Sequence, residues 1–225
     1  MIYLIPTKRG IGVEMWGTYE DLKELHGVIG RFWADENYES NKGFENRDAL
    51  LSSFSYEIRK AKEGSRMKRK KSHLSFENQE YFGTAFSWVH ILFSLTAIKY
   101  NMRYYETNKY EISLILLLEF WLEKAMYSYD EIGAQKLRGF IEDGLYGAND
   151  LIYQFMRSIN YEFFLLGGGK KAFRQLPILL KRGIYYTQEY TQHENFLKAE
   201  AVRLNCDASE LEVGDDDFDY GGIEW

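Results

Sequence analysis

The sequence predicts an α+β fold, predominantly helical, in which a small antiparallel N-terminal sheet packs on an antiparallel helical bundle. Two short β-rich runs open the chain, and apolar residues then recur at helical spacing over residues 81–205. Short connections near residues 107, 128 and 147 favour antiparallel helical neighbours. Because 45% of the 225 residues are apolar and 17% are aromatic, the chain can bury a sizeable core.

We expect a single globular domain over residues 1–206. It divides into a β-rich part with one helix (1–75) and the helical bundle (81–205). Residues 207–225 form a separate tail with eight acidic residues and no Lys or Arg, which we expect to be flexible. The tail accounts for the net charge of −6, because the rest of the chain has 26 acidic and 28 basic residues.

The first elements follow from turn and capping signals. Apolar runs at 2–5 and 12–16 flank a polar loop that ends in Gly10, which predicts a hairpin. Thr18 stands three residues before Asp21, a spacing typical of a capping box, so a helix is expected to begin there.

Residues 50–62 fit two patterns. Leu50, Phe54 and Ile58 are spaced as on one face of a helix, whereas Phe54, Tyr56 and Ile58 alternate with polar residues as in a strand. We interpret the segment as a strand that turns at a Glu-Gly pair into a second, basic strand. That interpretation gives a sheet of about four strands.

From residue 81 onward the periodicity predicts a series of helices. Segment 112–118 is apolar on every side, which indicates a buried helix. Pro177 suits the first turn of the last helix, where its missing N–H costs little. The uncharged run 81–98 is too polar for a membrane span, and no membrane partner is expected. The expected helices lie at 81–105, 109–127, 130–146, 149–166 and 178–205.

The composition limits the chemistry. Cys206 is the only cysteine, so neither an intrachain disulfide nor a cysteine-based zinc site is expected. The first residues lack the pattern of a signal peptide, and a reducing, cytoplasmic setting is the default expectation. Since no metal-binding or phosphate-binding motif is recognisable, we expect no metal and no cofactor.

His90 is the most interesting titratable residue. If residues 81–105 form one helix, His90 shares a narrow stripe of small and polar groups with Gly83, Ser87 and Ser94. Such a stripe either admits a second helix or lines a polar pocket. Glu119 and Glu123, on the next helix, are the weak candidates for its acid–base partners. A hydrogen-bonded core histidine is the simpler interpretation.

Residues 59–71 form a basic block with one acidic residue. Such a cluster can neutralise phosphates, and it can equally protect the exposed edge of a sheet from aggregation. The candidate nucleic-acid-binding residues are Arg59, Lys60, Arg66, Lys68, Arg69, Lys70 and Lys71.

Three segments carry a family resemblance. The run from Gly10 to Leu22, the segment 56–61 with its Glu-Gly turn, and Tyr81-Phe-Gly leading to Ser87-Trp88 resemble a family of uncharacterised bacterial proteins, a domain of unknown function. The resemblance covers the N-terminal half. It implies a bacterial origin and a strand at 53–61, and it assigns no activity.

Two functions remain open, and whether the protein is an enzyme is not decided. The leading hypothesis is a non-enzymatic interaction or regulatory protein that forms a homodimer through an aromatic-rich face. The alternative is a nucleic-acid-binding protein or nuclease that uses the basic block 59–71 with His73 or His90. A small-molecule enzyme centred on His90 and Glu119 is a third hypothesis.

Overall fold

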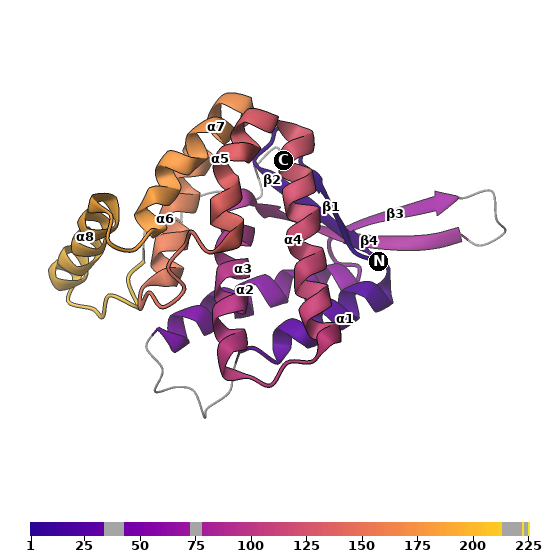
Figure 1. Ribbon diagram of the computed structural model, residues 1–225, viewed down its shortest axis with the longest axis horizontal. Coiled ribbons are helices and arrows are strands. Elements are labelled where there is room, and N and C mark those ends of the chain that lie inside the picture. The colour runs from indigo at the N-terminus through magenta and orange to yellow at the C-terminus, as the bar shows by residue number, and fades with distance from the viewer. Residues whose placement is uncertain (34–42, 73–77, 213–221, 223–224) are drawn as a thin grey trace.

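The computed structural model describes residues 1–33, 43–72, 78–212, 222 and 225 (Figure 1). It confirms a predominantly helical α+β fold with a small antiparallel sheet. The strands are β1 (Tyr3–Pro6), β2 (Gly12–Gly17), β3 (Met67–Ser72) and β4 (Asn78–Ser87), in the order β1-β2-β4-β3. Every pairing in this order is antiparallel.

The β1–β2 hairpin is confirmed. Thr7 closes its loop, because the Thr7 hydroxyl accepts hydrogen bonds from the backbone N–H groups of Ile11 and Gly12, both at 3.1 Å. Gly10 has a φ of 67°, and a Cβ there would lie 1.9 Å from the ring of Tyr129. The turn therefore requires glycine both for its backbone conformation and for the close approach of the ring.

The predicted strand within residues 50–62 is wrong. These residues belong to helix α2 (Phe44–Lys62), which packs on α1 (Tyr19–Gly30). Leu50, Phe54 and Ile58 are fully buried, while Tyr56 is 44% exposed. Since a strand would place Phe54, Tyr56 and Ile58 on one face, the burial follows the helical period.

The single helix predicted at 81–105 is also wrong. Residues up to Ser87 form β4, which is paired on both sides, and helix α3 (Trp88–Asn101) follows directly. Ser87 caps this helix by accepting a hydrogen bond from the backbone N–H of His90 at 2.9 Å. Gly83 and His90 therefore lie on different elements, and the polar stripe expected on one helix does not exist.

The C-terminal helices correspond to the prediction in part. Helices α4 (Lys109–Tyr129), α5 (Glu131–Glu142) and α6 (Ile152–Leu165) lie close to the expected ranges, and Thr18 with Asp21 forms the expected capping box on α1. The last predicted helix, 178–205, begins ten residues too early: it corresponds to α8 (Gln188–Leu204), and the preceding α7 (Gly169–Leu180) was not predicted. Pro177 consequently lies inside α7 and not in a first turn.

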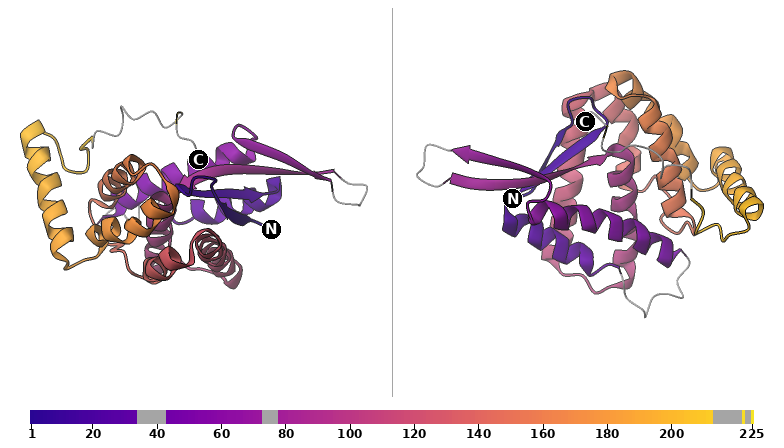
Figure 2. Two further views of the ribbon diagram at one scale, coloured as in Figure 1. Left: turned by 90° about the horizontal axis from the view of Figure 1, so that it is seen from above. Right: turned by 180° about the vertical axis from the view of Figure 1, so that it is seen from behind.

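The elements enclose one continuous core. Helices α1 and α2 contact the central strands, and α4 packs on β1 and α5. Two parts extend from this body: the β3–β4 hairpin, here called the arm, projects at one end, and α8 lies at the other (Figures 1 and 2). Leu211, at the start of the acidic tail, is 3% exposed and belongs to the core.

The predicted flexibility of the acidic tail concerns mainly residues 213–221 and 223–224, which lie outside the described part of the chain. The C-terminal Trp225 is described, and its ring lies 6.1 Å from that of Phe164. Among the described residues, none of the helices combines the length and the apolar character that crossing a membrane requires.

Candidate functional site

His90 is held among aromatic rings. Its imidazole meets Phe54 and Phe86 edge to face, with centroid distances of 5.9 and 5.5 Å. The ring is partly exposed, but its Nε2 is buried and has no hydrogen-bond partner among the described residues. Burial lowers the pKa of His90 to about 4, although the nearby Glu57 carboxylate acts in the opposite direction. His90 is therefore neutral at pH 7.

The structure does not bring Glu119 or Glu123 to His90. Glu119 forms an ion pair with Lys99 of α3 at 2.9 Å, and Lys99 also donates to the Ile141 carbonyl at 2.7 Å. His90 and Lys99 are nine residues apart, so they point to opposite sides of α3 at about 100° per residue. Glu123 lies 3.7 Å from Arg138 on α5. Both carboxylates link helices.

Much of the basic block is neutralised by acidic neighbours. Arg66 binds Glu57 through two hydrogen bonds of 2.7 and 2.8 Å, and Lys70 on β3 lies 3.6 Å from Glu80 on β4. Glu63 forms ion pairs with both Arg59 and Lys60, each at 3.5 Å.

Two further cations of the block lie against aromatic rings. The Arg69 guanidinium is 4.3 Å from the ring centroid of Trp16 and 5.0 Å from that of Tyr3. Lys68 is exposed, and its ammonium is 5.9 Å from the Phe82 centroid. The side chain of Lys71 lies outside the described part of the chain, as does His73.

A pocket of about 790 Å³ lies between α6 and α8. His193 of α8, which is 8% exposed, shares a hydrogen bond of 2.7 Å with the Ser158 hydroxyl of α6. Burial is the main cause that lowers the pKa of His193 to about 4, and Arg182 acts in the same direction. Arg182 itself binds Glu162 through two hydrogen bonds of 2.5 and 2.9 Å.

Nucleophilic chemistry at Ser158 is not favoured by this geometry. The Ser158 hydroxyl also donates to the Phe155 carbonyl at 3.2 Å. When the single hydroxyl proton points to that carbonyl, the His193 Nε2 is the donor in the shared bond, so the direction of this bond depends on the imidazole tautomer. Glu189, which the sequence places one helical turn before His193, forms an ion pair with Lys181 at 3.7 Å. No cluster of three potential metal ligands occurs in the described part of the chain.

Sequence reasoning missed this pocket because its polar residues come from separate elements. Ser158, Arg182 and His193 belong to α6, to the turn after α7 and to α8.

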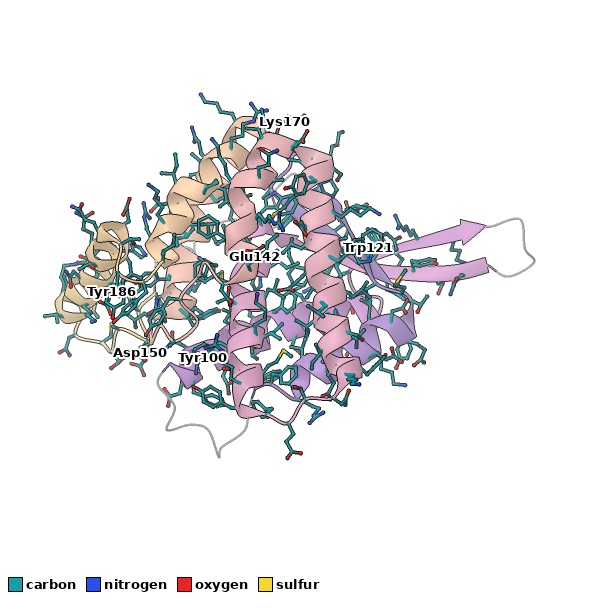
Figure 3. All side chains as sticks on the ribbon, in the orientation of Figure 1. Tyr100, Trp121, Glu142, Asp150, Lys170 and Tyr186 are labelled. Atoms are coloured by element: carbon teal, nitrogen blue, oxygen red, sulfur yellow. The ribbon has the colours of Figure 1, made fainter. Side chains whose placement is uncertain are left out.

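Helix α4 exposes apolar side chains, which corrects the prediction that segment 112–118 is buried. Ile115 and Leu118 are buried, but Ile112, Leu116 and Phe120 are 38%, 56% and 54% exposed. Trp121 lies on the side of α4 nearer the root of the arm (Figure 3), where its ring is 6.0 Å from that of Tyr3. The opposite side of α4, here called the α4 seam, carries Lys109, Ile112, Leu116, Phe120, Glu123 and Tyr127.

Comparison with known proteins identifies a family but no described relative. No curated protein and no solved structure matches the chain. A family model, described as a domain of unknown function (DUF6904), matches residues 2–225. The chain therefore belongs to the DUF6904 family.

Proposed function

We propose that this protein is a non-enzymatic interaction domain of the bacterial cytoplasm that works as a homodimer, with the α4 seam as its interface. The observation that carries the proposal is the exposure of Ile112, Leu116 and Phe120 on one side of a long helix. A helix that is apolar on every side is normally buried on every side. The described part of the chain covers only one side of α4.

The energetic argument favours a partner on this side. Burying a Leu, Ile or Phe side chain fully contributes about 1.5–3 kcal/mol. Because Ile112, Leu116 and Phe120 are 38%, 56% and 54% exposed, a symmetric interface that covers each of them twice gains about 4–9 kcal/mol. That gain is comparable with the cost of association, about 4–15 kcal/mol, so the seam supports a dimer when the surrounding rim adds contacts.

A second copy of the chain fits the seam by its charges. Lys109 is exposed near one end, and Glu123 is partly exposed near the other. A surface with opposite charges at its two ends is complementary to itself after a two-fold rotation. Two-fold homodimers are also the commonest oligomers of soluble proteins.

Other observations support the remaining parts of the proposal. Glu119 and Glu123 are engaged in ion pairs between helices, and the Ser158 hydroxyl donates to a backbone carbonyl. These contacts favour structural roles over acid–base roles. The single cysteine, Cys206, fits a reducing compartment.

We predict that Leu116→Asp converts the dimer into a monomer. The substitution would bury two carboxylates at the centre of the interface without partners, which is strongly unfavourable. Sedimentation velocity on the full chain should show a dimer for the wild type and a monomer for Leu116→Asp, with unchanged circular dichroism. The matched control is Val202→Asp on α8, where Val202 is 81% exposed and lies outside the seam. A dimeric Leu116→Asp protein would contradict the assignment of the interface.

The arm supports nucleic-acid binding as a second candidate function. It projects from the body and exposes Lys68 and Lys70 on β3 (Figures 1 and 2). A two-stranded ribbon of this kind can enter the major groove of DNA. The ion pairs to Glu57, Glu63 and Glu80 weaken this candidate, because they remove charge from the block.

The second candidate has its own test. It predicts that the protein binds duplex DNA or RNA at low salt. The logarithm of the binding constant should fall linearly with the logarithm of the salt concentration, and the size of this slope should decrease by about one for each lost phosphate contact. Lys68→Ala should make this salt dependence less steep, whereas Lys23→Ala on α1 should leave it unchanged. Lys23 is 56% exposed and lies outside the basic block. Failure to retain either nucleic acid at low salt would remove this candidate.

A further inference from the structure

We infer that the two α4 helices of the dimer pack antiparallel, with Leu116 on the two-fold axis and Lys109 of each chain opposite Glu123 of the other. This inference rests on the proposed function, because it specifies the geometry of the same interface. It follows from the positions of the exposed residues along and around α4.

The residues of the α4 seam form a narrow line within a wider exposed side of α4, which also carries Tyr110, Ser113, Lys124 and Ser128. At about 100° per residue, the six residues of the α4 seam fall within about 80° of the helix circumference. The buried residues Ile115, Leu118 and Leu122 are centred about 130° away around the helix. From Lys109 to Glu123 the line is about 21 Å long, or about four turns. A straight apolar line of this length suits contact with another helix.

Five of the six seam residues match one another in reverse order about Leu116, and Tyr127 has no counterpart on α4. Leu116 is equidistant from Ile112 and Phe120, which stand four residues before and after it. Lys109 and Glu123 likewise stand seven residues before and after Leu116. In an antiparallel pair centred on Leu116, each Ile112 therefore meets a Phe120, and each Lys109 meets a Glu123. Isologous contacts require this reciprocal pattern.

Charge decides between the two orientations. A parallel pair in the same register would place Lys109 against Lys109 and Glu123 against Glu123, and like charges across an interface are unfavourable. The antiparallel pair places opposite charges together twice. Within the described part of its own chain Lys109 forms no ion pair, and Glu123 has only the 3.7 Å approach of Arg138. Both side chains are available to a partner.

The first test is a charge exchange in the full-length protein. Lys109→Glu and Glu123→Lys each place like charges opposite one another twice, so each should weaken dimerisation about tenfold. The double variant restores opposite charges in exchanged positions, and its dissociation constant should return to within about threefold of the wild-type value. Two independent, additive losses in the double variant would overturn the antiparallel register.

The second test is cross-linking at the axis. Helices that pack 8–10 Å apart bring facing Cα atoms to about 3–5 Å, which overlaps the range for a disulfide. Leu116→Cys in a Cys206→Ser background should therefore form a covalent dimer under mild oxidation. The control is Ser128→Cys in the same background. Ser128 is exposed on α4, but the two copies would be about 36 Å apart along the helices.

The outcomes separate the two proposals. A wild-type dimer that gives no Leu116→Cys cross-link and no compensation by the charge exchange would overturn the antiparallel register and leave the homodimer intact. A wild type that is monomeric by sedimentation would overturn both. Cross-linking of Ser128→Cys as efficient as that of Leu116→Cys would also overturn the register, because it would indicate random collision.

Discussion

Replacing Arg47 with methionine is expected to lower the free energy of unfolding by about 3–5 kcal/mol, because partners of a fully buried cation lose their hydrogen bonds. Arg47 on α2 is 0% exposed. Its guanidinium donates to the Asn101 side chain of α3 at 2.6 Å and to the Gly147 carbonyl at 3.0 Å. It also lies 4.5 Å from the ring centroid of Tyr100, which Figure 3 shows toward one end of α3.

Urea denaturation measures this effect, with an unchanged m value as the sign that the unfolding transition is otherwise the same. The matched control is Arg59→Met on the same helix. Arg59 is 43% exposed and has an ion pair of 3.5 Å, so its loss should cost less than about 1 kcal/mol. A loss below about 1 kcal/mol for Arg47→Met as well would show that the buried cation does not stabilise the junction of α2 and α3.

Acidification below pH 6.5 is expected to destabilise the protein through His90 and His193. The pKa of each is lowered to about 4 in the folded protein, chiefly by burial. In the unfolded chain the same imidazoles have a pKa of about 6.5. As the pH falls from about 6.5 to about 4, the unfolded state therefore takes up protons that the folded state does not. By pH 5 the loss reaches up to about 2 kcal/mol for each imidazole.

The measurement has two parts. NMR titration of the folded protein should give a pKa near 4 for both imidazoles, with His90→Gln and His193→Gln providing the assignments. In urea denaturation each variant should lose less stability between pH 7 and pH 5 than the wild type does. Imidazoles that titrate near 6.5 in the folded protein would show that these sites are open to water.

The sequence predicted the fold class and the amphipathic helices because their signals are local. The capping box of Thr18 and the helix ranges after residue 109 depend on neighbours a few residues apart. The boundary between β4 and α3 was missed because α3 is buried on most sides, so it lacks an amphipathic stripe that marks its start. Ser87 was the available signal, since serine favours the N-cap position.

The error at residues 50–62 has a related cause. Phe54 and Ile58 satisfy both the period of 2 and the helical period, whereas Tyr56 fits only the period of 2, and Leu51 and Ala61 fit only the helical period. The 44% exposure of Tyr56 resolves the ambiguity, but exposure is a property of the tertiary structure. The available local signal was the apolar character of Leu51 and Ala61, which share a helical face with Phe54 but would point away from it in a strand.

Candidate sites were predictable only where one element carries them. The basic block lies on α2 and β3 as a continuous segment, but its ion pairs to Glu57 and Glu80 depend on the fold. The pocket beside His193 joins residues from distant segments, so spacing could not reveal it. The α4 seam was visible as an apolar run. Only the structure shows that the outer side of this helix faces away from the chain's own core.

The molar mass of the wild-type chain in solution tests the central claim most directly. One chain has a mass of 26.6 kDa. Light scattering coupled to size exclusion should give the mass of two chains, about 53 kDa, and dilution should shift the equilibrium toward 26.6 kDa. A mass of one chain at every concentration up to about 100 μM, where weak dimers form, would contradict the claim that the α4 seam is a homodimer interface.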